Sequence, residues 1–170
     1  VSRGRQSVSE SIAGTVLDSL EFARSGGALE RIVRLDELPR LADLLITTDG
    51  FLSLRLTGWR DNDKSWLQLD VAGELVLCCQ RCLDGVKLPL EIRSRLRLMA
   101  PGEEWPDDDL VDDSADALEA ENELAVLSLM EDEVLLALPI APMHEKCDPP
   151  SADAGKHGPS PFAALAALKK

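Results

Sequence analysis

Three successive stretches of alternating apolar and polar residues dominate the middle of the chain. In residues 51–58 leucines occupy every second position, and the same two-residue period returns in residues 66–79 and 86–98. That period is typical of β-strands with one buried and one exposed face. Polar segments at 59–65 and 80–85 are expected to form the turns between them. The sequence therefore predicts an antiparallel β meander or partial barrel.

A helix in the C-terminal half is the expected cover for this sheet, because a sheet with one apolar face must pack against a second layer. Residues 122–138 carry apolar side chains at three- and four-residue spacing, and Pro139 and Pro142 follow. Proline is typical of positions just beyond a helix end. A shorter helix is predicted from Asp36, as its N-cap, through Leu45. The predicted fold class is therefore α+β.

The net charge of −13 is concentrated in one part of the chain. Residues 98–145 contain fifteen acidic residues and no Lys or Arg, whereas residues 1–97 contain fourteen of each sign. Acidic blocks are usually solvated and repel phosphate, because nucleic-acid affinity comes largely from Lys and Arg. An RNA contact is therefore expected in the first hundred residues. The acidic segment 101–121 is expected to be mobile, since it has few apolar groups to bury.

Residues 1–147 are expected to form a single α+β domain that includes this acidic segment. Residues 148–170 are expected to form a flexible linker and a short terminal helix, in which Phe162 and Leu165 share one face. That helix would either dock on its own domain or act as a tethered recognition element. No apolar run approaches the ~20 residues of a membrane helix. Residues 1–10 lack the apolar core of a signal peptide, so the expected location is the cytoplasm, without membrane association.

The sharpest chemical pattern is the Cys-x-x-Cys knuckle formed by Cys79 and Cys82 between the second and third predicted strands. Such knuckles place two thiolates ~4 Å apart, as one tetrahedral zinc ion requires. His144 and Cys147 would complete a Cys3His site if the fold brought the two pairs together. The alternatives are unligated structural thiols and a thiol-active protein, although no thioredoxin-like βαβ pattern surrounds the knuckle.

A cationic stripe is predicted on the exposed face of the third strand, because a two-residue period aligns every second side chain. Its members are Lys87, Arg93, Arg95 and Arg97, and Arg81 in the adjacent turn would extend it. The stripe could contact RNA phosphates. It could equally pair with the acidic segment that follows it, in weak and salt-sensitive contacts.

Two tryptophans, Trp59 and Trp66, flank the turn between the first two predicted strands. Their rings could stack on nucleic-acid bases. The alternative is that they only pack beside the loop, which is the commoner role of tryptophans in such positions.

The sequence shows no catalytic constellation. It has no glycine-rich phosphate loop, and its only histidine besides His144 is His157 in the predicted linker. Glu131, Asp132 and Glu133 are consecutive, so they are predicted to point around a solvated helix face instead of converging. A protein that acts by binding, with no small-molecule substrate, is therefore predicted.

Three segments of the chain resemble the YceD family in their order and spacing. They are the knuckle Cys-Gln-Arg-Cys-Leu at 79–83, the run Met-Glu-Asp-Glu-Val-Leu-Leu-Ala-Leu-Pro at 130–139 with His144 and Cys147 after it, and Pro-Phe-Ala-Ala-Leu at 161–165. The resemblance extends from the middle of the chain to its end. Ser160 stands where many relatives carry asparagine.

The resemblance implies a bacterial protein that is required for large-subunit (23S) ribosomal RNA to accumulate, through its synthesis, processing or stability, and no known catalytic activity. Because some relatives lack the knuckle, it implies that zinc would be a stabiliser in a subset of the family.

Two binding modes follow as hypotheses. In one, the cationic stripe contacts ribosomal RNA; in the other, the acidic span 103–123 shields a basic large-subunit ribosomal protein. The candidate RNA- or partner-binding residues are Arg81, Lys87, Arg93, Arg95, Arg97, Glu131, Asp132, Phe162 and Leu165.

Overall fold

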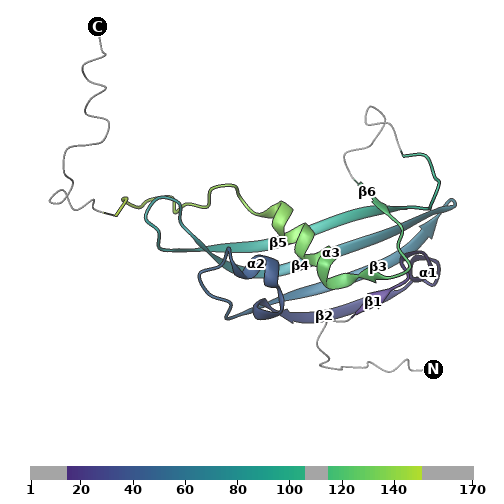
Figure 1. Cartoon of the computed structure of the whole chain (residues 1–170), viewed down its shortest axis with the longest axis horizontal. Helices are drawn as coiled ribbons and strands as arrows, with labels where there is room; N and C mark the ends of the chain where they lie inside the picture. The colour runs from purple at the N-terminus through teal and green to yellow at the C-terminus, as the bar shows by residue number, and fades with distance from the viewer. Residues whose placement is uncertain (1–14, 106–114, 151–170) are drawn as a thin grey trace, which may run out of the picture.

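A computed structural model describes residues 15–105 and 115–150. Its main element is a five-stranded sheet with the order β2-β3-β4-β5-β6 (Figure 1). Three of the neighbouring pairs are antiparallel and the β5–β6 pair is parallel. The strands are β2 (Ala28–Arg34), β3 (Phe51–Asp61), β4 (Lys64–Cys78), β5 (Gly85–Met99) and β6 (Asp116–Glu119). The predicted α+β class and meander are confirmed, and the sheet stays open without closing into a barrel.

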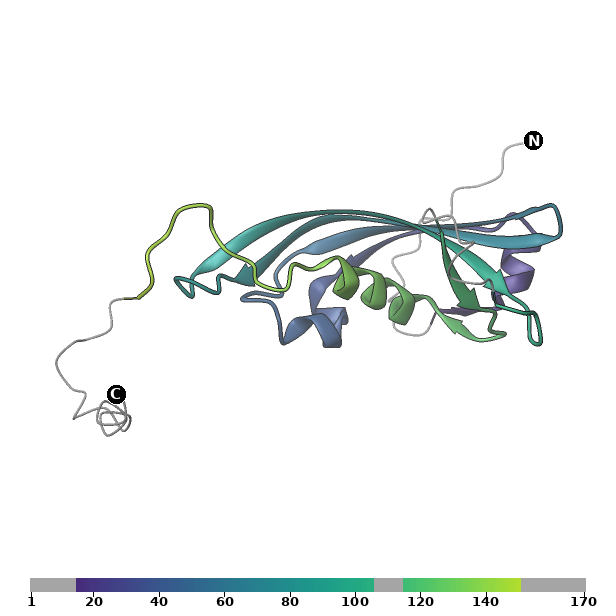
Figure 2. The same ribbon diagram turned by 90° about the horizontal axis from the view of Figure 1, so that it is seen from above.

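The remaining elements are short apart from one helix. They are β1 (Val16–Leu17), α1 (Ser19–Arg24), the 3-10 helix η2 (Leu35–Glu37), α2 (Pro39–Ala42), β7 (Leu124–Ala125) and α3 (Val126–Ala137). Strands β1 and β7 pair with each other in a separate two-stranded sheet. Figure 2 shows that the large sheet is arched and that α2 and α3 lie on its concave side.

The hydrophobic core lies between the concave face and these helices. Every second residue of the central strands is buried there, which is the physical basis of the alternation in the sequence. Buried core side chains contribute about 1.5–3 kcal/mol each relative to exposure. The sheet supplies Leu52, Leu54, Leu56, Leu67, Leu69, Val71, Leu75, Leu90, Leu96 and Leu98, and α3 supplies Val126, Met130 and Val134. The opposite side of the sheet is the convex face, and within the described residues no helix covers it.

The first forty residues, whose pairing the sequence does not predict, add an edge strand and a helix. The Asp18 side chain caps α1 by accepting a hydrogen bond from the Glu21 N–H at 2.8 Å. Helix α1 packs so closely on β3 that a Cβ at Gly58 would lie 2.9 Å from the Ala23 Cα. The Gly27 carbonyl accepts a hydrogen bond from the Gly58 N–H, so this glycine lets the helix and strand backbones meet.

The turn between β3 and β4 is shorter than predicted. Strand β3 continues past Trp59 to Asp61 and β4 begins at Lys64, so only Asn62 and Asp63 form the turn. These residues have φ angles of 46° and 68°, the left-handed conformation that tight hairpin turns require and that Asn and Asp tolerate. As a result Trp59 and Trp66 are direct cross-strand partners.

The two predicted helices differ from the observed ones. Asp36 is not an N-cap, because its carboxylate forms a bidentate pair with Arg34 at 2.8 and 2.9 Å and α2 begins at Pro39 instead. This pair also lowers the pKa of Asp36, chiefly through the side-chain hydrogen bond. The later helix is shorter than predicted, because Leu124 belongs to β7 and the helical turns start at Val126.

Part of the acidic segment 101–121 has a regular structure. It is predicted to be mobile, but residues 116–119 form β6 beside β5, and Leu118 packs against the core. The Ala120 N–H extends this pairing by donating to the Met99 carbonyl at 2.9 Å. The predicted terminal helix with Phe162 and Leu165 lies outside the described residues. Among those residues, no helix has the length and hydropathy of a membrane span.

Candidate functional site

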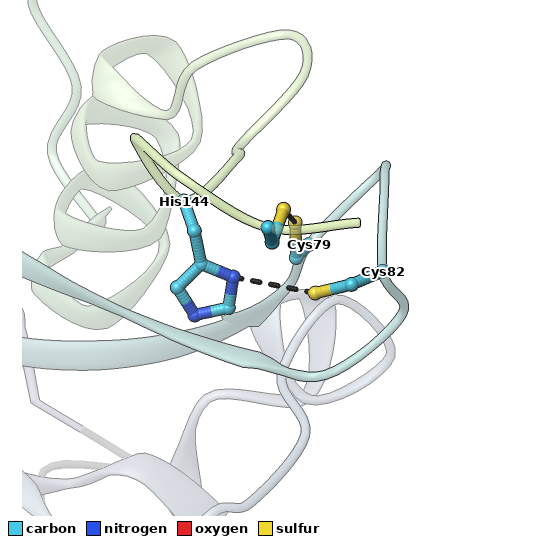
Figure 3. Close-up of side chains that lie close together, drawn as sticks. Cys79, Cys82 and His144 are labelled. Carbon is cyan, nitrogen blue, oxygen red and sulfur yellow. Dashed lines mark hydrogen bonds between the residues drawn. The ribbon is translucent and has the colours of Figure 1, made fainter. Parts of the chain in front are cut away.

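Four potential metal ligands converge where the β4–β5 hairpin meets the loop after α3. They are Cys79, Cys82, His144 and Cys147, and all of their ligand atoms lie within 4.8 Å of one another. We call this group the Cys3His cluster. Figure 3 shows the His144 ring directed at the Cys82 sulfur, with Cys79 beside them. The fold therefore brings together the two pairs that are about sixty residues apart in the sequence.

Backbone hydrogen bonds hold the knuckle in place. Cys79 follows directly on β4, and its N–H donates to the Asp84 carbonyl at 2.8 Å. The Leu83 N–H donates back to the Cys79 carbonyl at 3.0 Å, with Leu83 at a φ of 68°. The Gln80 N–H donates to the Pro142 carbonyl at 2.8 Å, which joins the knuckle to the loop after α3. The loop that carries His144 is thus positioned without help from a metal.

His144 is oriented by its second ring nitrogen. Its Nδ1 lies 3.3 Å from the Cys82 Sγ, and its Nε2 lies 3.1 Å from the Gly85 carbonyl oxygen. A carbonyl accepts hydrogen bonds only, so Nε2 is the protonated nitrogen and Nδ1 is left with its lone pair directed at the cluster. Metal-bound histidines are ordinarily held by such a bond from the other nitrogen.

Two of the distances within the cluster are close to those of a tetrahedral zinc site. With Zn–S bonds of ~2.3 Å and Zn–N bonds of ~2.0–2.1 Å, the ligand atoms should lie ~3.8 Å apart for two sulfurs and ~3.5 Å apart for sulfur and nitrogen. The Cys79 and Cys147 sulfurs are 3.8 Å apart, and the Cys82–His144 distance is 3.3 Å. All four cysteines of the chain are free thiols. A Cys3His donor set supplies all four positions of a structural zinc site.

The two thiols of the knuckle have opposite pKa shifts. The backbone N–H of Cys82 and neighbouring N–H groups lower the pKa of Cys79 from 9.0 to about 5, against the effect of burial. The backbone N–H of Asp84 acts to lower the pKa of Cys82, but burial and the thiols of Cys79 and Cys147 outweigh it and raise that pKa to about 11. Without a metal, the cluster therefore favours one thiolate beside a protonated thiol.

Two further residues belong to the surroundings of the cluster. Arg81 donates a hydrogen bond to the Cys147 carbonyl at 3.4 Å and contacts the Met143 sulfur at 3.9 Å. It therefore lies against the loop after α3, and its extension of the cationic stripe stays a prediction. Cys78 is not a member of the cluster, and its sulfur lies 3.5 Å from the Leu83 carbonyl oxygen and 3.8 Å from that of Cys79.

The cationic stripe lies on the convex face, where the cross-strand register places a carboxylate of β4 beside two of its four members. Lys87 pairs with Glu74 on β4 at 3.0 Å, and Arg93 pairs with Asp70 on β4 at 3.0 Å. Arg97 pairs with Glu103 at the start of the acidic segment. Pairing with the acidic segment is therefore limited, among the described residues, to Arg97.

Arg95 differs from the rest of the stripe. Its guanidinium lies 4.7 Å from the ring centroid of Trp66 and 5.7 Å from that of Trp59. Within the described part of the chain no carboxylate forms a salt bridge with it. The sequence predicts an aligned stripe, but the separate environment of Arg95 depends on the register between β4 and β5.

The three consecutive carboxylates of α3 contact two other elements, α2 and β5. Glu131 is only 3% exposed and accepts a hydrogen bond from the Arg40 N–H at 2.9 Å. Asp132 pairs with the Arg40 guanidinium, and Glu133 accepts a hydrogen bond from the Ser94 hydroxyl. Glu133 points away from the other two as predicted, whereas Glu131 and Asp132 both reach Arg40, and a solvated helix face is the wrong interpretation for Glu131. These carboxylates attach α3 to α2 and to β5.

Comparison with known proteins supports a family assignment. The family model described as Large ribosomal RNA subunit accumulation protein YceD matches residues 67–169. A Haemophilus influenzae protein of the same description is 30% identical over 153 residues, which is 79% of this chain and 83% of that protein. No solved structure matches the chain significantly. The matched residues include the Cys3His cluster, the cationic stripe and α3, and the chain belongs to the YceD family.

Proposed function

We propose that this protein supports the accumulation of large-subunit ribosomal RNA in the cytoplasm, and that it does so by binding instead of catalysis. The observation that carries the proposal is membership of a family described by that role. The Cys3His cluster supports the non-catalytic part, because four protein ligands leave no open metal position for water or substrate.

The proposed role of the Cys3His cluster is to hold one zinc ion as a structural clamp. Cys79 and Cys82 belong to the β4–β5 hairpin, whereas His144 and Cys147 belong to the loop after α3. A zinc ion would join these segments with four bonds. Elemental analysis of purified protein should find one zinc per chain, and Cys82→Ser should lose it. Cys78→Ser is the matched control, since the Cys78 sulfur lies outside the cluster.

Ribosomal RNA is the partner that the convex face supports best. No described helix covers this face, and it carries the cationic stripe together with Trp59 and Trp66. Lys87 and Arg93 have largely exposed side chains and pair with Glu74 and Asp70, and such surface pairs contribute only about 0–1 kcal/mol. Phosphate groups can therefore compete for them at little cost. This arrangement predicts moderate, salt-sensitive affinity.

A basic ribosomal protein is the second candidate partner. The observation that favours it is the run of fifteen acidic residues without any Lys or Arg in residues 98–145. Such a segment is complementary to a cationic protein and would keep it from nonspecific RNA contact.

Affinity capture from bacterial lysate distinguishes the two partners. The protein is captured at low and raised salt, with and without nuclease, and bound RNA and proteins are identified in the same samples. Ribosomal RNA that is recovered after ribosomal proteins are stripped supports the RNA form. A single basic ribosomal protein that persists after nuclease supports the second form, and recovery of neither class would contradict the proposal.

A further inference from the structure

We propose that Trp59, Trp66 and Arg95 form a binding site for unpaired nucleotides of RNA, in which the indole rings stack on bases and the guanidinium contacts phosphate. We call these three residues the Trp-Arg platform. The inference rests on the RNA form of the proposed function and specifies its ligand as single-stranded.

The platform is built by the register of three neighbouring strands. Trp59 on β3 is directly opposite Trp66 on β4, and Trp66 is in turn opposite Arg97 on β5. The two indole rings are nearly parallel, with an interplanar angle of 8° and centroids 6.1 Å apart. Arg95 is two residues before Arg97 on β5, and its exposed side chain lies over both rings. All three residues alternate with buried core positions and so lie on the convex face, and Trp66 is near the start of β4, the opposite end of that strand from the Cys3His cluster.

Arg95 is the member of the stripe whose charge is least satisfied by the protein itself. Lys87, Arg93 and Arg97 each have a carboxylate partner, whereas Arg95 has only the faces of the two indoles among the described residues. A cation–π contact does not use the N–H groups of the guanidinium as hydrogen-bond donors, so they remain available to an acceptor. A phosphate that draws Arg95 away from the indoles therefore breaks only a cation–π contact and no salt bridge, and this movement exposes the ring faces to a base.

Both indoles are accessible from solvent. Trp59 and Trp66 are partly exposed, and no described helix covers the face on which they lie. A base can therefore approach the rings without any rearrangement of the sheet.

The chemistry of the platform selects unpaired nucleotides. Bases of duplex RNA are already stacked on each other, and their faces are inaccessible to side chains. Unpaired bases can stack on aromatic rings while Arg or Lys contacts the backbone, with little dependence on sequence. The net charge of −13 opposes long-range attraction to RNA, so local stacking is expected to supply much of the affinity.

Tryptophan fluorescence provides a direct test in the full-length protein. Trp105, which is 54% exposed, is first replaced by Phe so that only the platform reports. A short single-stranded oligoadenylate should then quench the emission, and duplex RNA of the same length should not. Trp59→Ala is expected to weaken binding roughly 5- to 150-fold, the effect of losing one stacked base.

The pair Arg95→Gln and Arg93→Gln separates the platform from general electrostatics. Both variants lose one positive charge from the same face of β5, but Arg93 is paired with Asp70. Arg95→Gln should weaken binding and reduce the slope of log affinity against log salt by ~0.7, whereas Arg93→Gln should change both clearly less, because a phosphate at Arg93 must first displace Asp70. Both are surface changes, so thermal unfolding should match the parent protein.

Three results would overturn the proposal: no quenching by the single strand, equal affinity for duplex RNA, or equal effects of the two arginine variants. The ratio of 23S to 16S ribosomal RNA in cells that lack the gene is measured alongside. If that ratio falls while the quenching test fails, the platform is wrong and the proposed function stands. If the ratio is unchanged, the proposed function itself fails.

Discussion

The His144 Nε2 lies 3.1 Å from the carbonyl oxygen of Gly85, the first residue of β5, while the Nδ1 of the same ring faces the Cys82 sulfur. One ring thus connects the start of a core strand to the Cys3His cluster. The hydrogen bond fixes the tautomer that a metal requires. Folding of the hairpin and preparation of the metal site are therefore coupled.

Zinc removal is expected to destabilise the domain without unfolding it. The sheet core and the bond from Gln80 to Pro142 do not depend on metal, whereas the clamp does. At a zinc concentration 100 times the dissociation constant, binding adds about 2.7 kcal/mol, or roughly 5 to 11 °C in Tm. Thermal unfolding with and without a chelator measures this shift. The Cys82→Ser variant should show none, and a chelator effect of equal size in that variant would contradict the zinc clamp.

Leu83→Gly is expected to stabilise the knuckle. Leu83 has a φ of 68°, an unfavourable left-handed conformation for leucine. Its side chain is 61% exposed, so burial contributes little stability to offset this cost. Glycine adopts this conformation without the steric penalty, although it loses more conformational entropy on folding. The free energy of unfolding should therefore increase by about 0.5–1 kcal/mol. Urea denaturation of the zinc-loaded protein measures the change. A loss of stability of similar size would show that the leucine side chain makes a contact that matters more than its backbone.

Glu131→Ala is expected to cost about 1–3 kcal/mol, because the N–H of Arg40 at the start of α2 would lose its buried acceptor. Asp132→Asn is the matched comparison on the next residue. It breaks a salt bridge whose two side chains are about half exposed, which should cost at most about 1 kcal/mol. Chemical denaturation of both variants ranks them. Equal costs would contradict the structural role assigned to Glu131.

Gly58→Ala is expected to destabilise the fold by about 1–3 kcal/mol through overpacking. The added Cβ would lie 2.8 Å from the Phe22 ring and 2.9 Å from the Ala23 backbone, so α1 would have to move. Thr57→Ala, on the neighbouring residue and the opposite face, should cost about 0.5 kcal/mol or less. If both substitutions cost the same, close packing of α1 on β3 is not important for stability.

The sequence predicts the meander well because burial of one face imposes a strict two-residue period over long strands. It also predicts the members of the Cys3His cluster from ligand type and spacing, although only the fold shows that the pairs meet. It does not predict β6, because only Leu118 anchors that short strand in an acidic segment. The sequence also does not predict the pairing of Lys87 and Arg93 with carboxylates of β4, because that pairing depends on the cross-strand register.

Glu131 shows a different limit of sequence reasoning. Three consecutive acidic residues on a helix ordinarily indicate a solvated face. The exception arises because the backbone of α2, which is distant in sequence, requires an acceptor at this point. No local pattern in residues 126–137 indicates that requirement.

The ratio of 23S to 16S ribosomal RNA tests the central claim most directly. It is measured in cells in which the gene is deleted, and again after complementation with the parent protein or with Arg95→Gln. We predict that deletion lowers the ratio, that the parent protein restores it, and that Arg95→Gln restores it only in part. An unchanged ratio after deletion would contradict a role in the accumulation of large-subunit ribosomal RNA.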